Sequence, residues 1–345
     1  MILAMNSMFC QNANKSNLVS RKVLLENYGG TKCGNCPLAN STALQMENIY
    51  GNDIAIINIH AGFYANPNST YPTDLRTQCG NDWDMFFGIS NAGNPNGMVC
   101  RKDYSSNHIK FYTSWQSEIV GIIGQSAIAE ISISHSFINS LMNVDVKTKF
   151  FVNTNNRYKL ITVLTEDSVI ATQLDYSLPS GSQVNSSYVH YNVLRESLFG
   201  SWGTLLNSSS VSINDSITKS VSNYSVSSNY NPNNLNIVAF IYDTLTYEVM
   251  QVQKVGIQSI ITGIVSNSNK FNLIISPNPT NSTLSITSSF DYDTVKIINS
   301  FGQPVFIQEN NHETISVSNL PNSIYFIQLL DEKGNILKTE KFVKE

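Results

Sequence analysis

The sequence has few charged residues and no excess of basic ones. Asp, Glu, Lys and Arg make up 13% of its 345 residues, and the formal net charge is -4. Because binding to nucleic-acid phosphates needs a basic surface, this composition argues against DNA or RNA as a partner. From residue 20 onward the chain also lacks an unbroken apolar run of about 18 residues, which excludes a membrane-spanning helix from that part.

Histidine is scarce, and the histidines do not recur at the spacing of metal ligands. We therefore expect no metal and no cofactor. His60 ends an apolar stretch and either points toward the cysteines described below or is satisfied by nearby backbone. The five histidines are His60, His108, His135, His190 and His312.

The five cysteines suggest export. Cys10 lies in a short apolar segment that lacks the basic residues of a complete secretory signal. We interpret residues 1–19 as a truncated signal peptide or leader, with a disordered extension as the alternative. A lipid on Cys10 is disfavoured because the residues before it are not small. Removal of the leader leaves four cysteines, an even number that suits an oxidising compartment.

Cys33 and Cys36 lie between a predicted strand at residues 21–26 and a predicted helix at residues 37–50. The Ile-rich residues 53–60 predict a second strand, and the order strand, CxxC, helix, strand is typical of a βαβ unit. At a helix start, the helix dipole and neighbouring Lys32 stabilise a thiolate over a thiol. The pair is therefore a candidate for thiol–disulfide exchange or, alternatively, a fixed disulfide that closes a loop.

The first domain is predicted to span residues 20–124, with further helices at residues 82–87 and 109–123. Pro95 leads into a short apolar strand. A βαβ unit with CxxC at the helix start and a proline before a later strand resembles the thioredoxin fold. This resemblance implies that Pro95 is cis and faces the dithiol.

Longer motifs resemble the outer membrane protein twenty-eight related family of Bacteroidota over residues 21–255. The two resemblances together imply a thioredoxin-like protein in which Cys33 attacks, Cys36 resolves and Pro95 shapes the substrate groove. The motifs are VLLENYGGTKCGNCPLAN at 23–40, IHAG at 59–62, NPNGMVCR at 94–101, LTEDSV at 164–169 and YVHYNVLR at 188–195.

Two positions depart from the thioredoxin pattern. Lys32 occupies the place of an aromatic residue before the first cysteine, and Asn27 occupies that of a buried acid that accepts a proton from the resolving thiol. Glu26 is one residue earlier, and neighbouring side chains on a strand face opposite ways. Glu26 is the possible proton acceptor, but its direction puts that role in question.

Cys79 and Cys100 lie in a long connection and on the strand after Pro95. We predict that they form a second disulfide that ties the connection to the sheet. A competing hypothesis makes one of them a relay cysteine for Cys33.

Residues 125–257 become rich in Ser and Asn, with period-two alternation that predicts a second domain, an antiparallel β-sandwich. His190 and Arg195 could form a polar site there, but the surrounding aromatic residues favour a structural role. The predicted strands are residues 127–134, 142–147, 149–152, 159–166, 209–213, 217–221, 236–243 and 249–255.

Residues 258–269 read as a linker, and residues 270–345 resemble the C-terminal sorting domain of the type IX secretion system. Alternating apolar residues predict a small Ig-like β-sandwich. The resemblance implies passage across the outer membrane and attachment or release at the surface; an accessory module with another ligand is the alternative. The motifs are SPNPT at 276–280, LSI at 284–286, VKIINSFGQPV at 295–305, ISVSNLP at 315–321, IYFI at 324–327 and KFVK at 341–344.

The sequence thus predicts an α+β multidomain protein, exported through the periplasm to the cell surface by the type IX secretion machinery. Our first functional hypothesis is thiol–disulfide exchange on disulfide-bearing proteins, in which Cys33 attacks and Cys36 resolves. The second is a non-catalytic binding or adhesion protein that recognises surface ligands and keeps Cys33–Cys36 as a structural disulfide.

Overall fold

The computed structural model describes residues 19–104, 107–257, 273–288, 290–299, 303–309, 313–332, 334 and 336–345. The chain divides into two compact units, Met1–Ile261 and Thr262–Glu345. The predicted leader, except for residue 19, and the predicted linker lie outside the described residues. What is described is mostly β-structure, with three α-helices and five sheets. None of these helices is long and apolar enough to cross a membrane.

The predicted βαβ unit is confirmed. Strand β1 (Val23–Gly29) and strand β2 (Ile54–His60) pair in parallel and are connected by helix α1 (Cys36–Tyr50). Pro37 lies in the first turn of α1, where its missing N–H leaves no hydrogen bond unmade. Both strands are almost wholly buried because they are rich in Leu and Ile.

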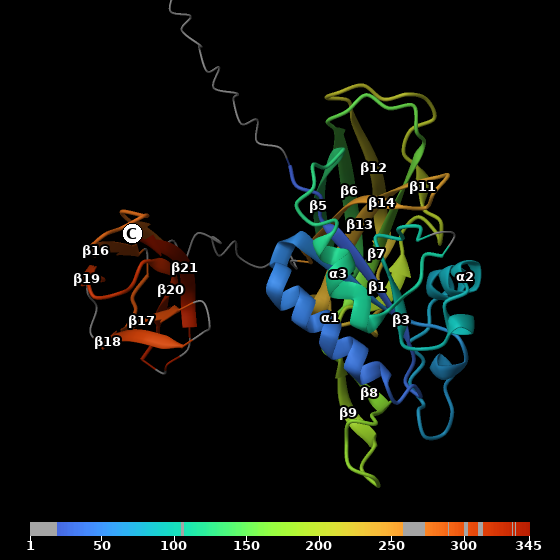
Figure 1. Ribbon diagram of the computed structural model, residues 1–345, viewed down its shortest axis with the longest axis horizontal. Coiled ribbons are helices and arrows are strands. Elements are labelled where there is room, and N and C mark those ends of the chain that lie inside the picture. The colour runs from blue at the N-terminus through green and yellow to red at the C-terminus, as the bar shows by residue number, and fades with distance from the viewer. Residues whose placement is uncertain are drawn as a thin grey trace, which may run out of the picture. The chain divides into compact units, whose positions relative to one another are not determined.

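One large sheet joins the two domains that the sequence predicts as separate. Its strand order is β14-β13-β7-β10-β2-β1-β3-β4, and β11 pairs with β7. The predicted boundary at residue 124 therefore falls inside one compact unit, in which β13 and β14 belong to the same sheet as β1 (Figure 1). The strands not yet given are β3 (Asn96–Val99), β4 (Lys110–Phe111), β7 (Tyr158–Glu166), β10 (Val193–Ser197), β11 (Thr204–Leu205), β13 (Leu235–Asp243) and β14 (Val249–Gly256).

The alternation of β7 and β13 divides their side chains between two cores. In β13, Phe240 faces the core shared with β1 and β2, whereas Ala239 faces a second core. That second core is shared with a three-stranded sheet of β5 (Ala129–Ile138), β6 (Leu141–Phe150) and β12 (Ser216–Ser225). Residues 125–257 thus form two packed layers of strands, as a sandwich would, but one of these layers belongs to the same sheet as β1 and β2.

Several other elements differ from the prediction. The predicted strands 142–147 and 149–152 merge into the single strand β6, which ends at Phe150, because Thr148 continues the pairing. Residues 209–213 contribute only a bridge at Val211. A hairpin of β8 (Val169–Leu174) and β9 (Val184–His190) was not expected; it projects near α1 in Figure 1. The remaining helices are α2 (Gln78–Phe87), α3 (Trp115–Val120) and the 3-10 helices Gly51–Asp53, Phe63–Ala65, Ser90–Ala92, Tyr112–Ser114 and Pro232–Asn234.

The second unit consists of two small antiparallel sheets around their own core. One sheet has the order β15-β16-β19 and the other β18-β17-β20-β21. The alternating apolar residues noted in the sequence, such as Leu284, Val295 and Ile315, point into this core. The strands are β15 (Leu273–Ser276), β16 (Thr283–Ser288), β17 (Thr294–Asn299), β18 (Pro304–Glu309), β19 (Thr314–Ser316), β20 (Ser323–Leu330) and β21 (Ile336–Lys344).

A fully buried ion pair connects β1 to the segment after β3. The Arg101 guanidinium donates to both carboxylate oxygens of Glu26, at 2.8 and 2.6 Å, and neither side chain has exposed area. The guanidinium carbon also lies 4.8 Å from the ring centre of Trp83 in α2 and 5.1 Å from that of Phe240 in β13. Glu26 and Arg101 thus link four segments of the first unit.

The predicted Cys79–Cys100 disulfide is not formed, because both residues are free thiols. Cys79 lies in α2, where its sulfur is 3.4 Å from the Thr77 hydroxyl, and the Cys100 sulfur accepts from the Leu24 amide. Both are buried in the core shared by β1 and β2. Each thiol is satisfied locally, so neither ties the long connection to the sheet.

We predict that Glu26→Gln destabilises the first unit by about 3–5 kcal/mol, because it leaves the buried Arg101 charge uncompensated. Urea unfolding followed by tryptophan fluorescence measures this, since Trp83, Trp115 and Trp202 all lie in that unit. The control is Glu118→Gln, which breaks the half-exposed Lys110–Glu118 pair and should cost below about 1 kcal/mol. Equal losses in the two variants would contradict the prediction.

We also predict that Cys79 and Cys100 resist alkylation in the native protein at pH 8. The thiolate is the reactive form, and burial raises the pKa of Cys79 and raises that of Cys100 to about 11. Peptide mass spectrometry after iodoacetamide treatment should find both unmodified in buffer and both modified in urea. Rapid native labelling, or a peptide joined by a Cys79–Cys100 disulfide, would show that the structural assignment is wrong.

Candidate functional site

Cys33 and Cys36 form a disulfide at the start of α1, with an S–S distance of 2.09 Å and a Cα–Cα distance of 5.3 Å. The loop after β1 turns twice, through hydrogen bonds from the Cys33 amide to Gly30 O and from the Cys36 amide to Cys33 O. The first turn of α1 contains no acidic residue. The positive end of the helix dipole is therefore not offset by a carboxylate of that turn.

Glycine permits the close packing around the disulfide. A Cβ atom at Gly29 would lie 2.8 Å from the Cys36 sulfur, and one at Gly34 would lie 2.6 Å from the Tyr176 ring. Both separations are shorter than ordinary van der Waals contact, so a larger residue at either position would displace the disulfide or its cover. Gly29 and Gly34 thus have a packing role beyond turn formation.

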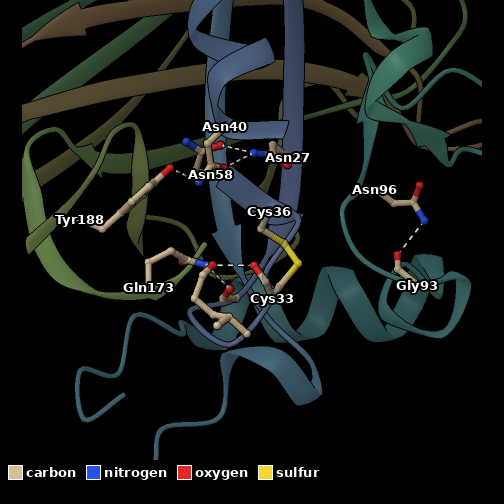
Figure 2. Close-up of a disulfide and its surroundings, with 11 residues drawn as sticks. Asn27, Cys33, Cys36, Asn40, Asn58, Gly93, Asn96, Gln173 and Tyr188 are labelled. Atoms are coloured by element: carbon tan, nitrogen blue, oxygen red, sulfur yellow. Dashed lines mark hydrogen bonds between the residues drawn. A yellow bond between two sulfur atoms is a disulfide. The ribbon is translucent and has the colours of Figure 1, made fainter. Parts of the chain in front are cut away.

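The segment that begins with β8 covers the disulfide. The Gln173 side-chain amide donates to Cys33 O at 3.0 Å (Figure 2), the Leu174 amide donates to Thr31 O, and the Tyr176 amide donates to Gly34 O. Cys33 and Cys36 are consequently only 4% and 3% exposed. Sequence reasoning missed this cover because its contacts join residues about 140 positions apart.

Glu26 does not face the disulfide. Its carboxylate is held by Arg101 in the buried ion pair, whereas Asn27, its neighbour on β1, lines a cavity of about 10 Å³ beside Cys36. The strand alternation noted in the sequence therefore places the amide, and not the acid, next to the resolving cysteine. Glu26 is unavailable to Cys36 as a proton acceptor in this structure.

A network of amide side chains surrounds this cavity (Figure 2). Asn27 Nδ2 donates to both Asn40 Oδ1 and Asn58 Oδ1 at 2.8 Å, and Asn40 Nδ2 donates to the Tyr188 hydroxyl in β9. The network connects β1, α1 and β2 to the covering hairpin. Asn27 and Asn58 are polar residues at paired positions of two buried, mostly apolar strands, a sequence signal that could have identified them.

His60 also lines the cavity with Cys36, and its Nδ1 has no hydrogen-bond partner in the described part of the chain. Its ring packs against His190 of β9, with ring centres 5.2 Å apart. Burial lowers the pKa of His60 well below its ordinary value, and nearby His190 and Arg195 lower it further. Burial likewise lowers the pKa of His190 to about 4. Both rings are therefore neutral at pH 7.

Arg195 does not form a polar site with His190. Its Nε donates to Glu166 at 2.7 Å, and its guanidinium lies 5.0 Å from the ring centre of Tyr230. These contacts agree with the structural role preferred for Arg195 on sequence grounds.

The other predicted site residues lie near the disulfide or in the core. The Asn94–Pro95 bond is cis, as the thioredoxin resemblance implies, and Pro95 is buried. Asn96 pairs with Tyr28 in antiparallel register. The preceding residue, Pro95, therefore lies opposite the residue that follows Tyr28, which is Gly29. Lys32 lies over the Phe63 ring at 4.8 Å. Cys79 and Cys100 line no part of the cavity beside Cys36.

Within the described residues, no three His, Cys, Asp or Glu side chains are placed to hold a metal ion. The chemistry available beside Cys36 is thus that of a disulfide, neutral amides and two neutral imidazoles. Such a site could exchange disulfides, or it could keep one closed.

Comparison with known structures shows the fold. HBP35 of Porphyromonas gingivalis is similar over 94% of this chain and 99% of its own, with a TM-score of 0.51 and 15% sequence identity. A domain of the outer membrane lipoprotein Omp28 from Porphyromonas gingivalis is 22% identical, covering 39% of this chain and 90% of its own, with a TM-score of 0.25. The comparison with curated proteins found no match.

Comparison with protein families divides the chain in two. Residues 84–259 match outer membrane protein Omp28, and residues 275–345 match the secretion system C-terminal sorting domain. The Cys33–Cys36 disulfide precedes the first matched range, so the family match does not bear on its chemistry. The chain belongs to the Omp28 outer membrane protein family and carries a C-terminal sorting domain, which makes it a cell-surface or outer-membrane-associated protein that uses a secretion machinery.

Proposed function

We propose that this protein is a thioredoxin-like thiol–disulfide oxidoreductase of the cell surface, sent there by the type IX secretion system. The observation that supports the proposal is the cavity beside Cys36, which is lined by neutral amides and by His60. Among the described residues, Nδ1 of His60 has no hydrogen-bond partner. A disulfide that only closed a loop would have no need of an adjacent base. The position of the pair at the start of α1 favours a thiolate once the disulfide is reduced.

The exchange proceeds in two steps that pass two electrons to the substrate. In the reduced protein, the Cys33 thiolate attacks a substrate disulfide, forms a mixed disulfide and releases the first substrate thiolate. The Cys36 thiolate then attacks the Cys33 sulfur, restores the Cys33–Cys36 bond and releases the second substrate thiolate. Disulfide-bearing proteins outside the cell are the substrates in this proposal.

His60 accepts the proton of Cys36 in the second step. A buried acid has this role in the thioredoxin pattern, but here Asn27 occupies its position. His60 lines the same cavity, is neutral at pH 7 because burial lowers its pKa, and has Nδ1 unpartnered among the described residues. A neutral imidazole in this position can take up the proton without first losing one.

The cover over the disulfide favours a second candidate function. Both sulfurs are nearly inaccessible beneath Gln173 and Tyr176, which suits a structural bond in a non-catalytic binding or adhesion protein. In that case Cys33–Cys36 fastens the loop before α1 and never opens.

The reduction potential separates the two functions. An exchanging disulfide should equilibrate with a glutathione or dithiothreitol buffer at roughly -120 to -270 mV, whereas a structural one lies below about -300 mV. Mass spectrometry of alkylated Cys33 and Cys36 across the buffer series measures this value. Insulin reduction should be lost in Cys33→Ser and kept in Cys79→Ala, which removes a buried thiol elsewhere. Equal activity of Cys33→Ser and wild type would favour the binding protein.

The role of His60 predicts a pH dependence. With Cys33 held as a mixed disulfide with thionitrobenzoate, in a Cys10→Ser background, release of the dye reports attack by Cys36. In wild type the rate should stay level as the pH falls from 8 through 6.5, because the pKa of His60 lies well below that value. In His60→Gln the rate should fall about tenfold per pH unit below the ordinary thiol pKa of about 8.5.

At pH 7 the His60→Gln variant should thus be at least about tenfold slower than wild type, and the two should converge near pH 9. The control is His135→Gln on β5, which replaces a histidine outside the cavity and should follow the wild-type profile. Parallel profiles for His60→Gln and wild type would rule out His60 as the proton acceptor. They would leave the reduction potential, and with it the proposed exchange, unaffected.

A further inference from the structure

A second pocket of the first unit, about 270 Å³ in volume, shares no residue with the cavity beside Cys36. It opens at the surface, where Phe86 is 53% exposed. Its volume is near the lower end of small-molecule sites, which suits one ring of a ligand. The lining residues are Phe86, Lys159, Trp202, Tyr242, Thr244 and Tyr247.

Four aromatic rings from separate segments form the walls. The Phe86 ring of α2 lies 4.9 Å, centre to centre, from both Trp202 and Tyr247, and Tyr242 of β13 stacks on Tyr247 at 6.0 Å. The Tyr242 hydroxyl donates to the backbone oxygen of Trp202 at 2.9 Å. The rings are fixed by one another and by the sheet, so the pocket is formed before any ligand arrives.

Tyr247 is held in a strained conformation at the edge of the pocket. Its φ is +62°, in the left-handed region that bulky residues rarely adopt, and such strain is concentrated at functional sites. The turn between β13 and β14 imposes it, because the Tyr247 amide donates to Asp243 O while the Asp243 carboxylate accepts from the Leu245 amide. The fold thus holds Tyr247, whose ring borders the pocket, in an energetically unfavourable backbone conformation.

The pocket carries one positive charge and no negative one. Lys159 has no hydrogen-bond or ion-pair partner among the described side chains, and no carboxylate lines the pocket. The acids within two residues of the lining residues in the sequence are already engaged. Glu248 pairs with Arg21, Asp243 accepts from Asn156, and Asp84 accepts from Ser90. A ligand with a carboxylate would therefore pair with Lys159.

We propose that this pocket binds a carboxylate-bearing sugar ring, such as the hexuronic acid unit of an acidic glycan. The negative faces of aromatic rings attract the C–H face of a pyranose, while its hydroxyls can pair with the Thr244 and tyrosine hydroxyls. A purely apolar ligand would bury these polar groups without partners, which is unfavourable. The localisation of the chain exposes the pocket to glycans outside the cell, and the site operates independently of Cys33 and Cys36.

The test compares methyl β-D-glucuronide with methyl β-D-glucoside, which differ only in the carboxylate. Titration of the full chain, followed by tryptophan fluorescence, to which Trp202 in the pocket contributes, and by saturation-transfer NMR, should show the glucuronide binding at least tenfold more tightly. Lys159→Gln should abolish this preference without preventing binding of the glucoside, and Phe86→Ala, at an exposed position, should weaken both sugars at least fivefold.

Lys219→Gln is the matched control, because Lys219 is a half-exposed lysine on β12 outside the pocket. It should preserve both affinities, and Cys33→Ser should do the same. Equal affinity for the two sugars, no saturable binding of either, or loss of the preference in Lys219→Gln would each overturn the proposal.

Discussion

The buried pair of Glu26 and Arg101 is the constraint on which the first unit depends. A desolvated carboxylate and guanidinium are tolerated only if they stay paired, and here the pair is also enclosed by Trp83 and Phe240. Since these residues come from β1, the segment after β3, α2 and β13, the pair is enclosed in this way only when all four segments are assembled. Because β13 follows residue 124, this enclosure links the two sides of the predicted boundary.

The same pair determines which side chain of β1 faces the disulfide. Because strand residues alternate, burying Glu26 against Arg101 turns Asn27 toward Cys36. Neutral amides that hydrogen-bond to one another then fill the space in which a carboxylate would stand. A buried, unpaired carboxylate would carry a large desolvation cost there, whereas the neutral His60 carries a smaller one and remains able to accept a proton.

Local sequence patterns predicted the parts of the fold that depend on local interactions. The CxxC at the start of α1, the flanking strands and the alternating strands of the second unit all follow from periodicity and turn residues. What could not be predicted depends on distant pairing. The partner of Glu26 is 75 residues away and the cover of Cys33 is 140 residues away. Likewise, the positions of Cys79 in the long connection and of Cys100 on the strand after Pro95 suggested a bond between them, but both are buried free thiols.

The free energy that holds the covering segment in place determines how strongly it limits access to the Cys33–Cys36 disulfide. Its three hydrogen bonds of 3.0 Å or less to the loop come from Gln173, Leu174 and Tyr176, and each contributes about 1 kcal/mol net. Releasing these three bonds costs about 3 kcal/mol. Since each 1.4 kcal/mol is a factor of about ten, the cover is displaced and the disulfide exposed about 1% of the time. Exposure for that fraction would slow exchange about a hundredfold relative to an exposed disulfide, without preventing it. The thermodynamics of the Cys33–Cys36 bond, and not its exposure, therefore decides between catalysis and structure.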